Sequence, residues 1–89
     1  MTTTGIANWL ENSVTLFPNP AKEYVDILID GDLNVKMMEV YDVYGKLINT
    51  VNVIDNPTRI NVSSLANGMY FVRVTTEAGA VTKTFVKKG

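Results

Sequence analysis

The sequence predicts an all-β fold, an immunoglobulin-like antiparallel β-sandwich of about seven strands. Turn-forming residues recur at intervals of about a dozen residues or less, and the runs between them are rich in β-branched and aromatic residues. After the ambiguous start, residues 6–10, no segment keeps the apolar spacing of an amphipathic helix. A closed barrel stays open as the alternative, because alternation alone does not separate the two architectures.

Size and composition limit the functions open to the chain. Its 89 residues suit one domain. The 8 Lys and Arg balance 9 Asp and Glu, which argues against a charge-driven attraction to nucleic acid or an anionic membrane. No apolar run approaches the roughly 20 residues of a membrane-spanning helix. Cysteine and histidine are absent, so disulfides, thiolate sites and the commonest transition-metal ligands are excluded. We therefore expect no cofactor and no metal.

The first two strands are expected at residues 14–17 and 24–29. The first run alternates and then stops at a Pro-Asn-Pro tripeptide, because proline lacks an N–H and fixes φ. In the second run, Val25, Ile27 and Ile29 share one face, as residues two apart do in a strand. The tripeptide therefore ends one strand and directs the chain toward the next.

A hairpin and a further strand are expected in the middle of the chain. Residues 35–42 and 47–53 are joined by a short turn in which Gly45 is suited to a positive φ, so these two strands pair antiparallel. After an Asp-Asn-Pro break, residues 58–62 form the fifth strand. Leu65, the single large apolar residue of the following turn, is expected to cover the end of the core.

The last two strands are expected at residues 69–75 and 81–87, with a Glu-Ala-Gly turn between them. Tyr70, Val72 and Val74 share one face of the sixth strand and are predicted to point into the core. Seven short strands with tight turns leave little chain for helices, which favours the sandwich.

Candidate sites for chemistry are weaker than their structural explanations. Residues 30–34 begin like a calcium-binding loop, but Tyr41 stands where the bidentate Glu is needed, so an ordinary turn is favoured. Carboxylates for glycoside cleavage are available at Asp26, Asp30, Asp32, Asp42 and Asp55. Most of them flank turns, where Asp caps backbone donors, and a small sandwich offers no deep cleft.

The aromatic residues that could stack on sugars are Trp9, Tyr24, Tyr41 and Tyr44, with no flat platform evident. We predict that the protein is not an enzyme.

Four motifs in a fixed order carry more information than any of these. They are Leu16-Phe17-Pro18-Asn19-Pro20-Ala21, then Val40-Tyr41-Asp42-Val43-Tyr44-Gly45-Lys46-Leu47-Ile48, then Ile60-Asn61-Val62-Ser63-Ser64-Leu65-Ala66-Asn67-Gly68-Met69-Tyr70-Phe71-Val72-Arg73-Val74, and Lys83-Thr84-Phe85-Val86-Lys87-Lys88. Together they resemble the type A C-terminal sorting domain of the type IX, or Por, secretion system of the Bacteroidetes. Each motif alone is weak, but four in order over most of the chain are specific.

The resemblance implies a secretion signal with a seven-stranded immunoglobulin-like sandwich. Such domains are joined to secreted or surface proteins that cross the inner membrane on a signal peptide, and the outer-membrane translocon recognises the domain in the periplasm. A sortase-like cysteine peptidase commonly removes the domain afterwards, and the cargo is released or attached at the cell surface. Residues 14–89 are then the sorting domain, and residues 1–13 combine a vector-like start with a linker from the cargo.

The sorting-motif residues that the resemblance implies are Pro18, Asn19, Pro20, Asp42, Gly45, Leu65, Gly68, Tyr70, Lys83, Phe85, Lys87 and Lys88. In the last strand, Lys83, Phe85 and Lys87 fall on one face. We expect Phe85 to anchor this strand in the core, while its lysines and its exposed edge meet the translocon by strand addition.

A rival hypothesis is an accessory sandwich module for carbohydrate binding or adhesion. The expected partners of a sorting domain are instead the translocon, the sortase-like peptidase and the linked cargo, with neither nucleic acid binding nor membrane insertion. Exposed strand edges also favour strand exchange or edge pairing between isolated copies.

Overall fold

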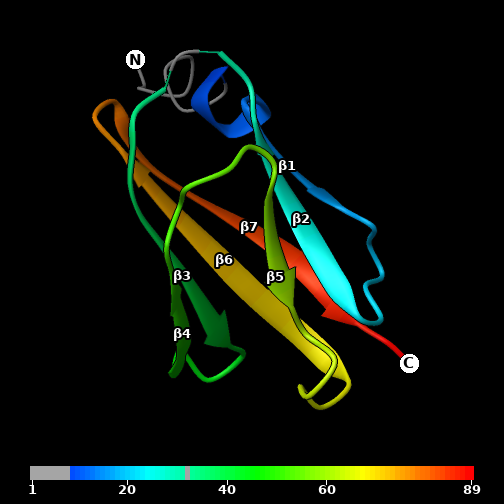
Figure 1. The fold of residues 1–89 in the computed structure, drawn as a ribbon. Coiled ribbons are helices and arrows are strands. Elements are labelled where there is room, and N and C mark those ends of the chain that lie inside the picture. Colours follow the sequence, from blue (N-terminus) through cyan, green and yellow to red (C-terminus); the bar gives the residue numbers. More distant parts are fainter. Residues whose placement is uncertain (1–8, 32) are drawn as a thin grey trace.

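The seven expected strands are present and follow one another in the predicted order. The computed structural model describes residues 9–31 and 33–89 (Figure 1). The strands are β1 Val14–Phe17, β2 Tyr24–Ile29, β3 Val35–Asp42, β4 Leu47–Val51, β5 Thr58–Asn61, β6 Gly68–Thr76 and β7 Gly79–Lys87. β4 and β5 end slightly earlier than predicted, whereas β6 and β7 extend further at their turns. A short helical turn at residues 9–12 precedes β1.

The strands form two separate antiparallel sheets, which confirms the sandwich and excludes the closed barrel. One sheet has the order β1-β2-β5 and the other β4-β3-β6-β7. The fourth strand therefore lies beside β3 and not beside β5, a variation within immunoglobulin-like sandwiches. The hairpin of β3 and β4 has the predicted antiparallel pairing. No helix in the described part of the chain has the length and apolarity needed to cross a bilayer.

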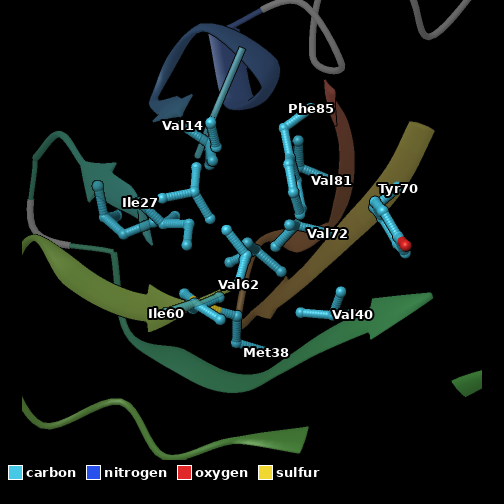
Figure 2. Packing of buried hydrophobic residues seen from close by; sticks show 14 of the residues in the cluster. Val14, Ile27, Met38, Val40, Ile60, Val62, Tyr70, Val72, Val81 and Phe85 are labelled. Atoms are coloured by element: carbon cyan, nitrogen blue, oxygen red, sulfur yellow. The ribbon is translucent and has the colours of Figure 1, made fainter. Parts of the chain in front are cut away.

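The core lies between the two sheets and is built by the alternating residues of the strands other than β4 (Figure 2). The inward faces predicted for β2 and β6 are confirmed, because Val25, Ile27, Ile29, Tyr70, Val72 and Val74 are all buried. Leu65 is half-buried and packs against this cluster, as expected. The period of two in the sequence therefore predicts which side chains fill the core.

One of the five candidate carboxylates is buried. Asp26 lies in the middle of β2, and it is 6% exposed. Its carboxylate accepts hydrogen bonds from Arg59 Nε at 2.9 Å and Nη2 at 3.1 Å. The guanidinium lies 3.7 Å from the ring centroid of Tyr24. Arg59 on neighbouring β5 covers the acid in a bidentate pair, and a carboxylate held in this way is structural.

The loops gather at two opposite ends of the sandwich (Figure 1). Residues 9–13 and the loops after β2, β4 and β6 share one end, where Asp30 N–H donates to Ser13 O at 2.8 Å and Asn34 N–H donates to Glu77 Oε1 at 2.6 Å. The opposite end, here called the C-terminal end, carries the loops after β1, β3 and β5 together with the end of β7. Asp32, a member of the calcium-loop alternative, lies outside the described residues.

Candidate recognition site at the C-terminal end

The Pro-Asn-Pro segment lies against the last strand, sixty-odd residues further along the chain. Asn19 Oδ1 accepts the N–H of Val86 at 3.0 Å, and Asn19 Nδ2 donates to the carbonyl of Thr84 at 3.4 Å. The backbone continues the contact, because Ala21 N–H donates to Val86 O at 2.7 Å and Lys88 N–H donates to Ala21 O at 2.9 Å. Residues 19–21 therefore cover the outer edge of β7; we call this segment the edge cover.

The chemistry of an asparagine between two prolines explains the edge cover. Each proline lacks an N–H, so the backbone around Asn19 has few donors to give to a sheet. The side-chain amide of Asn19 has the same donor and acceptor as a peptide group, and it occupies that place in the ladder. The sequence predicts an exposed edge at β7. That prediction is wrong from Thr84 to Lys88, where the outward N–H and C=O groups already have partners.

The anchoring of β7 by Phe85 is confirmed. Phe85 is fully buried, and its ring stacks on Tyr70 of β6 with centroids 5.5 Å apart and planes 21° apart (Figure 2). The two residues are also cross-strand partners in the β6–β7 ladder. The strand that carries the terminal motif is therefore held by an aromatic pair inside the core.

The lysines of β7 do not all face solvent as expected. Lys87 lies on the core face with Phe85, is 5% exposed, and donates from Nζ to the carbonyl of Leu65 at 3.1 Å. Its aliphatic stem covers the end of the core while its ammonium reaches a backbone acceptor. Lys83 is half-buried in mid-strand, and Lys88 is exposed. Lys87 is therefore a structural contact in the folded domain.

The Gly-x-Tyr motif forms a corner at the start of β6. The hydroxyl of Tyr70 donates to the carbonyl of Ala66, four residues upstream, at 2.6 Å. Gly68, between them, has a φ of 149°, a value that favours glycine. This is the tyrosine corner of immunoglobulin-like sandwiches, in which a Tyr at the start of a strand bonds back to the preceding turn. The Leu65 carbonyl that accepts from Lys87 belongs to the same turn, so the corner and the last strand are joined.

Replacing Tyr70 with Phe should cost about 1 kcal/mol of unfolding free energy, because the Ala66 carbonyl loses its donor while the ring still packs on Phe85. Urea denaturation monitored by circular dichroism measures the loss. Tyr44→Phe is the matched control, since Tyr44 is 91% exposed. Equal stability of the two variants would contradict the role of the corner.

The central motif forms the tip of the β3–β4 hairpin. Asp42 Oδ1 accepts the N–H of Tyr44 at 2.9 Å and that of Lys46 at 3.0 Å. Gly45 has a φ of 82°, as the sequence predicts for this turn. Asp42 pairs with Tyr70 in the β3–β6 ladder, so the hairpin tip lies beside the corner. Its carboxylate is occupied by backbone donors and fixes the shape of the turn.

The structure brings the four motifs together although they are spread over the whole chain. A hollow of about 320 Å³ lies between the hairpin tip and the corner, lined by residues 42–44 and 66–70. The end of β7 and its edge cover complete this end of the sandwich (Figure 1). Of the predicted site residues, Lys83 lies furthest away, in the middle of β7 opposite Val72.

The aromatic residues considered for sugar stacking are dispersed. Trp9 belongs to the helical turn at residues 9–12 and Tyr44 to the turn between β3 and β4, two segments at opposite ends of the sandwich (Figure 1). Tyr24 lies under Arg59 on the smaller sheet, whereas Tyr41 belongs to β3 of the larger one. They form no common platform.

Comparison with known families settles the relationship of the chain. A model of the secretion system C-terminal sorting domain matches residues 15–88. The chain belongs to this family. Sorting domains of the type IX system are signals and not a catalytic family, and membership implies an attached N-terminal cargo, the type IX secretion machinery and a secreted or surface destination. A search of curated proteins found no match.

Residues that pattern reasoning missed are mainly backbone partners of the sorting motifs. Ala21, Thr84 and Val86 contribute main-chain groups to the edge cover, and Ala66 contributes one to the corner. The available signal for the edge cover was an Asn between two prolines. The backbone of such a segment has few N–H donors, so its hydrogen bonds to a neighbouring strand must come partly from the Asn side chain.

Proposed function

We propose that residues 14–89 are a sorting signal that the outer-membrane translocon of the type IX system reads as a folded domain, at its C-terminal end. The convergence of the four family motifs supports this proposal. Several motif residues hold the fold, among them Asn19, Tyr70 and Lys87, and together they fix the shape of one surface. A rigid scaffold of this kind presents loops and a strand end at constant spacing, which suits recognition.

The mode of recognition that we propose differs from simple strand addition along β7. The end of that strand and Lys88, which follows it, are paired with the edge cover, so a partner strand would have to displace Asn19 and Ala21 first. Side chains and loops of the C-terminal end are directly available instead. The translocon then reads a surface rather than a free backbone edge.

Export of a reporter tests the proposal. A reporter with a signal peptide and the whole chain at its C-terminus is produced in a Bacteroidetes host, and the medium, cell surface and periplasm are assayed. We expect the reporter outside the outer membrane. A reporter retained in the periplasm, while a known sorting domain exports it in parallel, would contradict the proposal.

We also propose that the domain crosses the periplasm attached to its cargo, and that a sortase-like peptidase cuts within the junction, residues 1–13, after export. The family relationship supports this step. Mass spectrometry of the exported reporter should show that residues 14–89 are missing. Intact reporter-domain fusion outside the cell as the sole product would rule out removal.

A further inference from the structure

The outer face of the larger sheet carries an apolar patch that the fold itself does not use. Met69 of β6 and Val86 of β7 are cross-strand partners and are 46% and 36% exposed. Leu47 of β4 is paired with Tyr41 of β3, which is paired in turn with Phe71 of β6. Residues on one face of adjacent strands are direct neighbours, so these five side chains form one surface. We call it the outer patch.

The outer patch lies at the C-terminal end of the larger sheet. Next to it along the strands, Glu39 of β3, Arg73 of β6 and Thr82 of β7 form a polar row across the same face. Val43, 50% exposed, and Met69 line the hollow beside the hairpin tip, so the patch adjoins the place where the motifs converge. A hydrogen bond with Glu39 raises the pKa of Tyr41, whose phenol is uncharged at neutral pH in any case.

Around the outer patch, the exposed cations Lys46, Arg73 and Lys88 outnumber the carboxylates of Glu39 and Asp42. Lys46 precedes Leu47 at the β4 side and Lys88 follows β7 at the other side, and both are exposed. Asp42, the acid at the nearby hairpin tip, is engaged by two backbone donors. An exposed apolar surface flanked by exposed cations fits a partner with an apolar surface that is rimmed by carboxylates.

We propose that the outer patch is the docking surface for the component of the secretion machinery that binds the sorting domain, and that this partner offers an apolar area flanked by acidic side chains. The proposal rests on the proposed function and assigns it to a surface. It also distinguishes two sets of motif residues: Asn19, Tyr70 and Lys87 hold the shape, whereas Met69, Val86 and their neighbours make the contact.

Two methionines on the same sheet give a matched test. Met69 and Met37 are 46% and 45% exposed, and both point outward from the larger sheet, but Met37 lies beyond the polar row and pairs with Thr75. Met69→Glu should lower export of the reporter fused to the full chain by about tenfold or more, because a carboxylate in an apolar contact is costly and like charges repel. Met37→Glu should stay within about twofold of the parent chain, as a surface change away from the contact does.

Further variants separate the contact from its alternatives. Met69→Leu should export normally, and Met69→Lys should be less harmful than Met69→Glu if the partner is acidic. Thermal melting of the purified domains checks that all variants stay folded. Export by folded Met69→Glu at the parent level overturns the docking proposal but leaves the proposed function standing, because the parent chain still exports. Equal export defects for Met37→Glu and Met69→Glu would also overturn it. So would a parent domain that is a dimer in solution and a Met69→Glu domain that is a monomer, if the two export equally well.

Discussion

Replacing Phe85 with alanine is expected to remove about 3–5 kcal/mol of unfolding free energy, the range for truncating a buried aromatic ring. Phe85 has no exposed surface, and its ring stacks on Tyr70. A domain of this size has a total stability of about 5–10 kcal/mol, so the loss is a large part of it. The melting temperature should fall by about 12–40 °C, at about 4–8 °C for each kcal/mol. Calorimetry of the purified chain measures the shift.

The neighbour on the other face of β7 supplies the control. Thr84 is exposed, and Thr84→Ala should change stability by no more than about 0.5 kcal/mol. Phe85→Leu should lie between the two, since most of the volume is kept. A Phe85→Ala domain that melts within a few degrees of the parent would show that this residue is not the anchor. If export fails only in those Phe85 variants that have lost the fold, Phe85 supports recognition by stabilising the domain and not by contacting the partner.

Replacing Asn19 with alanine is expected to release the edge cover from β7. The variant loses both side-chain hydrogen bonds to the strand, at Val86 N–H and Thr84 O. The Val86 amide should then exchange with solvent about tenfold faster or more, because it no longer has a protein acceptor. The unfolding free energy should fall by about 1 kcal/mol. Hydrogen exchange followed by nuclear magnetic resonance measures the effect at the single amide.

Asn19→Asp is the sharper form of the same test. It keeps the acceptor for Val86 N–H but replaces the donor to Thr84 with an oxygen, so two acceptors face each other. Its exchange rate at Val86 should therefore lie between those of the parent and Asn19→Ala, while its stability falls at least as far. Asn52→Ala, at an exposed position after β4, is the control. Unchanged protection at Val86 in Asn19→Ala would show that the side chain does not hold the edge.

The succession of strands along the chain and the residues of the core were predictable because they depend on local patterns. Alternation identified the inward residues of β2 and β6, and one glycine located the hairpin turn at Gly45. Such signals act over two to five residues and locate the strands, whereas the pairings of β2 with β5 and of β3 with β6 join strands that are not consecutive in sequence. The fold class required no knowledge of distant contacts.

The errors have a common physical cause, which is contact between segments far apart in the chain. Alternation places Lys87 on the same face as Phe85. Because lysine usually prefers water, its side chain was nevertheless expected in solvent. The deciding feature is the Leu65 carbonyl, 22 residues away, which accepts from its ammonium. Similarly, a proline-interrupted segment gives no local sign of the strand it will lie beside, so the cover on β7 was not foreseen. The burial of Asp26 likewise depends on Arg59, which belongs to another strand.

The two ends of the sandwich have one more consequence. Residues 9–12 lie at one end and the convergent motifs at the other, in a domain whose longest dimension is 40 Å (Figure 1). A protein joined ahead of residue 9 is therefore attached at the end of the domain that lies away from the partner bound at the motifs. We expect the domain to act as a rigid spacer as well as a label, so that access to the motif surface depends little on the size of the attached protein.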